Sequence, residues 1–319
     1  MERAASEAGI DWAARQYGRE KFSRWTTDAR ETADDLHELF GLFKEVRPWF
    51  GKPPVVTANF ITHTPVLDEN DQLRFVPLSQ RAPELLIHYR QAMREGYLCP
   101  QYHGFCHFNS SELEDYTQSR ECREAHRNGF MLARCTMKGS RNFLHGELSS
   151  ANRKAHEHLS QGLSEFGRLF GGASVSLIPP TYILDHALLP TLVSSGIRYI
   201  QGGNQLRTNR GARHARPILR QKDGIYWGVR NTRLDPHPDY GHDHEVCLKA
   251  IEQAFTDQLP AVIDFHRVNF SGAFTPDYRD RTLTQLRCLF HGIRQKWPDA
   301  SFMSTPEFLN YLHGAPQSN

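Results

Sequence analysis

Apolar residues in this chain fall into stretches with a helical period, and short, mostly apolar runs lie between them. The clearest stretch follows Thr32-x-x-Asp35, which resembles a capping box and precedes apolar positions at helical spacing over 36–43. A second sequence of the capping type, Ser111-x-x-Glu114, predicts the start of another helix. Gly96 and Gly171 are expected to end two helices. The predicted helices after the first are 83–94, 155–170, 185–193, 245–255 and 282–296.

The short apolar runs predict strands that alternate with these helices. Seven strands are expected, at 55–61, 97–103, 173–178, 197–201, 225–230, 261–266 and 301–304. Strands joined mostly by helical crossovers run parallel and form right-handed βαβ units. The predicted fold class is therefore α/β, a (β/α) barrel that is seven-stranded or irregular.

The pattern favours one structural domain, because the sequence has no short internal repeat and no low-complexity linker. Barrels of this type take about 250 residues, which fits within a chain of 319. We expect residues 1–50 to form a helical segment that packs on a barrel over 51–319. Residues 117–148 are polar without a clean period and are interpreted as an insertion.

Composition narrows the class of protein further. Lys and Arg total 38 against 36 for Asp and Glu, so the balance does not indicate a nucleic-acid partner. No run of about 18 apolar residues is present, which predicts no membrane span. The first residues lack the apolar core of a secretory signal, and the six cysteines form no CxxC pair. We expect reduced thiols and a cytoplasmic protein, and leave its oligomeric state open.

Two histidines four residues apart stand where a predicted strand runs into a loop. Imidazole is the commonest protein ligand for zinc and similar metals, so His103 and His107 are candidate metal ligands. Gln101 shares the face of His103 on the strand. Arg230 and His266 also stand at the carboxyl ends of predicted strands, where barrel enzymes carry their chemistry.

Asp264-Phe-His266 is a second candidate for chemistry. A carboxylate that orients an imidazole makes it a general acid or base near neutral pH, although Asp264 can equally cap the loop that follows. Arg267 and Asn269 could bind sugar hydroxyls or a carboxylate. The histidines in 239–244 and the His145-Gly-Glu147 sequence are interpreted as loop residues without a special role. No P-loop, GxGxxG or GxSxG sequence is present.

Taken in order, several fragments resemble the polysaccharide deacetylase-like branch of the glycoside hydrolase/deacetylase barrel superfamily. The resemblance covers most of residues 30–312. The fragments that carry it are Pro100-Gln-Tyr-His-Gly-x-x-His107-x-Asn109, Ile178-Pro-Pro180, Tyr226-x-x-x-Arg-Asn231, His266-Arg-x-Asn-Phe-x-Gly272 and Phe302-Met-Ser304.

The resemblance implies a metal-dependent hydrolase that removes an acyl group from an acetylated carbohydrate. It implies that His103 and His107 bind zinc, or else cobalt or nickel, and that His266 is the general acid, oriented by Asp264. The polar residues expected to position the sugar are Gln101, Asn59, Arg230, Asn231, Arg267 and Asn269.

The sequence departs from the family at its acidic first strand. Residues 55–61 correspond to the second strand, and nothing upstream of residue 30 resembles a strand that ends in two acids. Either the chain begins late or the protein has lost these groups, for which Asn59 and Asp28 are weak substitutes. In addition, Ser176-Leu-Ile stands where the family has an arginine.

Two other functions stay open. A metal-free glycoside hydrolase on the same barrel needs two carboxylates about 5–10 Å apart, of which Asp264 is one candidate. A catalytically inactive carbohydrate-binding protein is favoured if the acidic strand is absent.

Overall fold

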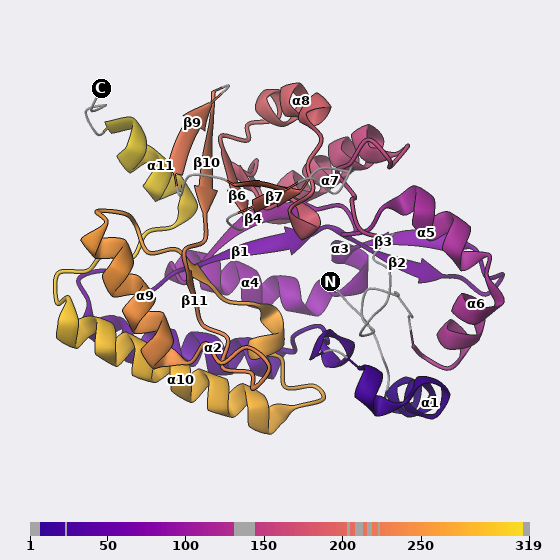
Figure 1. Ribbon diagram of the computed structural model, residues 1–319, viewed down its shortest axis with the longest axis horizontal. Helices are drawn as coiled ribbons and strands as arrows, with labels where there is room; N and C mark the ends of the chain where they lie inside the picture. Colours follow the sequence, from indigo (N-terminus) through magenta and orange to yellow (C-terminus); the bar gives the residue numbers. More distant parts are fainter. Residues whose placement is uncertain are drawn as a thin grey trace.

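The computed structural model describes residues 7–22, 24–130, 144–202, 205–207, 213–215, 219–222 and 224–314 (Figure 1). Its centre is a six-stranded sheet in the order β1-β4-β5-β6-β10-β9. The neighbours from β1 to β10 are parallel, and β9 runs antiparallel to β10. The bounds are β1 (Val56–Ile61), β4 (Leu98–Gly104), β5 (Ser176–Leu177), β6 (Tyr199–Gly202), β9 (Leu219–Lys222) and β10 (Ile225–Val229).

This arrangement confirms the mixed α/β class with a mostly parallel sheet. Two further strands, β11 (Thr232–Arg233) and β12 (Ile263–Asp264), pair in parallel with each other. Among the residues described above, no strand pairing joins β12 to β1, so hydrogen bonds do not close the strands into a ring. The closed barrel, and with it the division at residue 50, stays a prediction.

The predicted strand at 301–304 is wrong. This segment is not paired with the sheet and leads into α11 (Thr305–Gly314). The backbone N–H and the hydroxyl of Ser304 both donate to the carboxylate of Glu307, at 2.8 and 2.7 Å. Ser304 therefore bonds to the first turn of α11 and not to a neighbouring strand.

The helices on the sheet mostly begin and end as predicted. In α2 (Ala33–Val46), the Thr32 hydroxyl accepts from the Asp35 N–H while the Asp35 carboxylate accepts from the Thr32 N–H, which confirms the capping box. Helices α4 (Pro83–Glu95) and α7 (Ala155–Phe170) end at glycines in the left-handed conformation, as predicted.

The remaining helices are shorter or lie toward the ends of the chain. The α-helices are α1 (Glu7–Tyr17), α3 (Leu78–Arg81), α5 (Ser110–Thr117), α6 (Arg120–Arg127), α8 (Leu189–Ser194), α9 (His244–Thr256) and α10 (Pro276–Lys296). The 3₁₀ helices are η1 (Arg19–Lys21), η2 (Arg24–Thr27), η3 (Arg47–Trp49), η5 (Pro180–Tyr182), η6 (His186–Leu188) and η7 (Arg267–Asn269).

One predicted helix start needs correction. The side chain that caps α5 is Asn109, which accepts from the N–H groups of Ser111 and Glu112, and Ser111 already lies within the helix. Asn is as good an N-cap as Ser, and the capping sequence at Ser111 predicted the helix start two residues too late. Of the predicted insertion at 117–148, the described part includes α6, and residues 131–143 lie outside the described residues.

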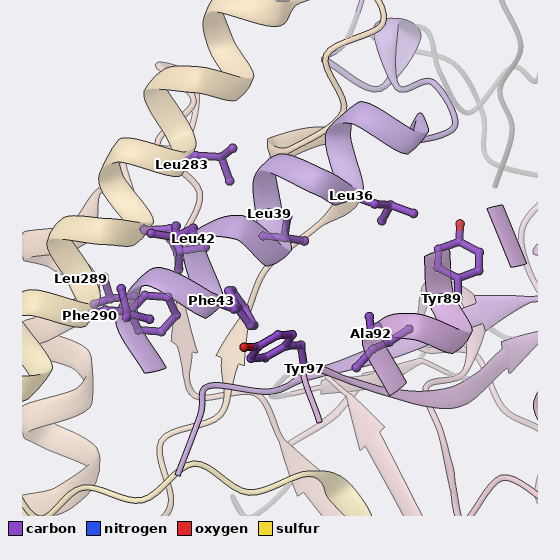
Figure 2. Close-up of a cluster of buried hydrophobic side chains, with 14 of the residues drawn as sticks. Leu36, Leu39, Leu42, Phe43, Tyr89, Ala92, Tyr97, Leu283, Leu289 and Phe290 are labelled. Atoms are coloured by element: carbon purple, nitrogen blue, oxygen red, sulfur yellow. The ribbon is translucent and has the colours of Figure 1, made fainter. Parts of the chain in front are cut away.

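Two apolar clusters cover the sheet. In Figure 2, Leu39 and Phe43 of α2 lie between Leu283 and Phe290 of α10 and Tyr97 at the start of β4. A second cluster joins α7 and α8 to the strands. The strands direct their apolar side chains to the face that these clusters cover, and residues such as Asn59 and Gln101 to the other face.

A hairpin that the sequence analysis missed lies beside the carboxyl end of β4. Its strands are β2 (His63–Leu67) and β3 (Leu73–Pro77). The ring of His63 stacks on Phe105 with the centroids 4.0 Å apart, and Phe105 stacks on His158 at the same separation. Burial lowers the pKa of His63 from 6.5 to about 4, so this imidazole is neutral at pH 7.

We predict that His63→Phe flattens the pH dependence of stability. Between pH 6.5 and 4 the unfolded state binds a proton at His63 that the folded state does not, so the free energy of unfolding falls as the pH falls. Phenylalanine keeps the stacked ring but cannot bind a proton. Urea denaturation at pH 7 and pH 4.5 should show the wild type losing roughly 1–2 kcal/mol more than the variant. Equal losses would contradict this account.

Candidate active site

The carboxyl end of β4 brings His103 and His107 together. Tyr102 packs into the cluster under α7, so its neighbours Gln101 and His103 point to the other face of the sheet. After His103 the chain turns back through Gly104, with φ of 154°, to His107, which has φ of 72°. The two imidazole centroids lie 5.1 Å apart with an angle of 66° between the ring planes.

His103 is held in one tautomer by the neighbouring strand. Its Nδ1 lies 2.7 Å from the carbonyl oxygen of Ile178, which can only accept, so Nδ1 carries the hydrogen and Nε2 keeps its lone pair. Burial lowers the pKa of His103 to about 4, against the effect of that hydrogen bond, and the nearby Arg230 and His266 lower it further. The ring is therefore neutral at pH 7, which is the form that binds metals.

The separation of the two rings is that of imidazoles that share one divalent ion. Imidazoles that bind zinc through nitrogen at roughly 2.0–2.1 Å, with a near-tetrahedral angle, have centroids about 5 Å apart. The bond from Nδ1 of His103 to a carbonyl is also the usual support of a histidine ligand. Among the described residues there is no group of three His, Cys, Asp or Glu side chains that could hold a metal. Metal binding by the two histidines therefore stays a prediction.

His266 lies in the same neighbourhood but not on a strand. Strand β12 ends at Asp264, and His266 is the N-cap of η7, which corrects the predicted strand end. This change of direction places Nδ1 of His266 3.5 Å from the Asp264 carboxylate, closer than alternation along a strand allows. Asp264 also forms an ion pair with Arg230, in which both side chains are mostly buried.

Tyr182 belongs to this group, although the sequence analysis did not identify it. Its hydroxyl accepts a hydrogen bond from the Arg230 guanidinium, which joins η5 to the Asp264 side chain. Thr181 and Tyr182 have φ of 54° and 60°, a conformation that non-glycine residues seldom adopt. Such strained backbone is concentrated at functional sites. The sequence feature that could have identified Tyr182 is its position two residues after Pro180, close to the end of β5.

The segment before α2 contacts His266 and Arg267 of the candidate site. Trp25 contacts His266 edge-on, with centroids 5.2 Å apart. Asp28 accepts two hydrogen bonds from Arg267, at 3.2 and 3.0 Å, and Glu31 lies 3.6 Å from the same guanidinium. Burial lowers the pKa of Arg267, but Asp28 and Glu31 together raise it above its ordinary value. Arg267 thus ties this segment to η7.

Four other residues predicted to bind substrate have protein partners. The Gln101 side chain oxygen accepts from Ser174, Val175 and Ser176, and Asn59 donates to the Thr57 carbonyl. Asn231 bonds to Pro260 and Val262, and Asn269 bonds to Leu234 and Tyr278. These contacts join neighbouring strands and loops, so a role in substrate binding stays a prediction for all four.

The loop over 239–244 and Glu147 were both predicted to have no special role, and the structure places them differently. Asp243 caps α9, and His244 bonds to Gln285, so these two residues support a helix. Glu147, interpreted from the sequence as an ordinary loop residue, has no exposed surface, and its carboxylate accepts from the N–H groups of Phe105, Cys106 and His107. Burial raises the pKa of Glu147 to about 7, although these three bonds lower it.

Comparison with known proteins adds only coarse likenesses. No family model and no curated protein matches the chain. Among solved structures, 4-alpha-glucanotransferase from Thermococcus litoralis aligns with a TM-score of 0.48 and 12% identity over 87% of this chain and 37% of its own length. A putative polysaccharide deacetylase from Mycobacterium smegmatis aligns with a TM-score of 0.44 and 12% identity over 89% and 80%.

A third structure, a GH57-type branching enzyme from Pyrococcus horikoshii, has a TM-score of 0.44 and 11% identity over 89% of this chain and 53% of its own. The chain therefore spans little more than a third of the glucanotransferase and about half of the branching enzyme. No described helix is both long and apolar enough to cross a membrane.

We predict that Arg230 matters more to stability than Tyr182. Arg230→Gln leaves the buried Asp264 carboxylate without its cation, and breaking such a pair costs about 3 kcal/mol. Tyr182→Phe removes one hydrogen bond, worth about 1 kcal/mol. Urea denaturation of both variants at pH 7 measures the difference, and an equal or smaller loss for Arg230→Gln would show that Asp264 does not depend on the pair.

Proposed function

We propose that this protein is a divalent-metal-dependent hydrolase that removes an acyl group from an acetylated carbohydrate. The observation that carries the proposal is that the His103–His107 pair, in which the His103 ring is neutral, lies at the same end of the sheet as the His266–Asp264 pair. The metal would be zinc, or alternatively cobalt or nickel. The carbohydrate substrate is taken from the sequence fragments described above, and a closed barrel belongs to the same proposal.

The histidine pair would hold the ion through the nitrogens left by its structural hydrogen bonds. His103 offers Nε2, because Nδ1 is bonded to the Ile178 carbonyl. A bound divalent ion supplies Lewis acidity, which polarises an acyl oxygen and makes water a better nucleophile. The ring of His103 needs no deprotonation to bind at neutral pH, since its pKa is lowered to about 4.

His266 would hold the proton that the leaving group needs. With Nδ1 turned toward Asp264, Nε2 would donate the proton. Asp264 would stabilise the charged ring, and Arg230 forms an ion pair with that carboxylate and holds it in place. The distance of 3.5 Å exceeds a good hydrogen bond, and such catalytic contacts often tighten when substrate binds.

The first test is metal binding. We expect about one equivalent of zinc or cobalt per chain after reconstitution, lost in His103→Ala/His107→Ala. His242→Ala/His244→Ala, which removes the first histidine of α9 and one from the loop before it, should keep the metal. Metal analysis after dialysis gives the stoichiometry. No bound metal in the wild type would contradict the proposal and leave a glycoside hydrolase or a non-catalytic binder.

The second test separates the general acid from the metal pair. His266→Asn should lower kcat for acetate release from acetylated sugars by about 10²–10⁴-fold while leaving metal content unchanged. His88→Asn, on the exposed side of α4, is the matched control and should retain full activity. Release of reducing sugar in place of acetate, by protein without metal, would support the glycosidase instead.

A further inference from the structure

Glu147 is a buried carboxylate whose bonds all go to one short turn. Its two oxygens accept from three successive backbone N–H groups, at 2.7 Å from Phe105, at 2.9 Å from Cys106, and from His107. Successive N–H groups that converge in this way form a site for an anion. Here the anion is supplied from 40 residues away along the chain.

The turn that Glu147 binds is the one that brings His107 back to His103. Gly104 and His107 both have positive φ, a conformation that costs energy for His107 and needs outside support. The space beside Gly104 is also filled by Glu147, because a Cβ added to Gly104 would lie 2.7 Å from its Oε1. Carboxylate and turn therefore fit each other closely.

Glu147 is itself held in place by hydrogen bonds to the backbone of its own segment. Its carbonyl accepts from the side chain of Asn152 at 2.8 Å, and the Asn152 side chain oxygen accepts from the hydroxyls of Ser110 and Ser111 at the start of α5. The Leu144 carbonyl accepts from the N–H of Asn109 at 2.7 Å. The segment that carries Glu147 is thus attached to the helix that follows the turn, which makes it a rigid support.

We propose that Glu147 is a positioning residue that holds the turn over 104–107 and thereby sets His107 against His103 for metal binding. The proposal rests on the proposed function for its ligand, a divalent cation of the zinc type. Supporting groups of this kind affect metal affinity by roughly 10–100-fold. Glu147 does not contact the cation in this proposal, and acts only through His107.

The test is the zinc affinity of Glu147→Gln, measured by competition with a chelator on protein shown to be folded. Glutamine has nearly the same shape, but one of its terminal atoms is a donor that faces N–H donors, so the three bonds cannot all form. We expect zinc to bind about tenfold more weakly or worse. Affinity within about twofold of the wild type would overturn the proposal.

A matched control distinguishes positioning from a general loss of stability. Asp35→Asn changes another buried carboxylate that accepts backbone N–H groups, at the start of α2, and should lower stability without changing zinc affinity. If Glu147→Gln does not fold, Gly104→Ala is the second variant, because its Cβ would lie 2.7 Å from Oε1 of Glu147 and 2.9 Å from Cγ of Pro180; the same loss of affinity is expected. Unchanged affinity in Gly104→Ala would overturn the proposal.

A second readout does not need the metal. Amide hydrogen exchange over residues 104–108, without zinc, should be faster in Glu147→Gln than in the wild type and unchanged in Asp35→Asn, because only the first variant removes acceptors from this turn. Unchanged exchange would overturn the anchoring role of Glu147. A wild type that binds no zinc would overturn the proposed function, while the exchange result would still decide whether Glu147 holds the turn.

Discussion

Parallel pairing of β4, β5, β6 and β10 is the constraint on which the rest of this structure depends. Parallel strands present their carboxyl ends at one edge of the sheet, so the residues that follow them come together although they are far apart in sequence. His103 at the end of β4, η5 after β5 and Arg230 after β10 meet for this reason. The pairing in turn requires both faces of the sheet to be covered. Helices α2, α4, α10, α7 and α8 pack on the face that carries Leu98 and Tyr102, and α11 packs on Tyr199 and Tyr226 of the opposite face.

The groups at this edge are charged or polar and mostly buried, and each has a partner of matching chemistry. Arg230 lies between Asp264 and Tyr182, Arg267 between Asp28 and Glu31, and Glu147 faces three backbone N–H groups. Burying such groups without partners would cost several kcal/mol each. The partners come from distant segments, so the ion pairs that satisfy these charges also fix the loops around the histidines. Stability and the geometry of the candidate site are therefore coupled through the same contacts.

Individual helices and strands show how far the sequence predicts the fold. The capping box before α2 and the glycines that end α4 and α7 are local signals, and the structure follows them because caps depend on neighbouring residues alone. The strand expected at 301–304 failed because its apolar pattern suits any half-buried extended segment, and bonds from Ser304 to Glu307 decided for a helix start. The β2–β3 hairpin was missed for a related reason, since its pairing joins two short strands with a mixed pattern.

For the site, the sequence by itself supplied the candidates for metal-binding and acid–base chemistry, and the alternation of elements that places most of them near strand ends. Only the tertiary structure decided which of them meet. It bonded Arg267, Asn231 and Asn269 to protein groups, and placed Tyr182 and Trp25 beside Arg230 and His266. It also showed Glu147 as a buried carboxyl group that accepts from backbone N–H groups. The physical reason is that a side chain's partner is fixed by contacts between segments far apart in the chain, which no local pattern encodes.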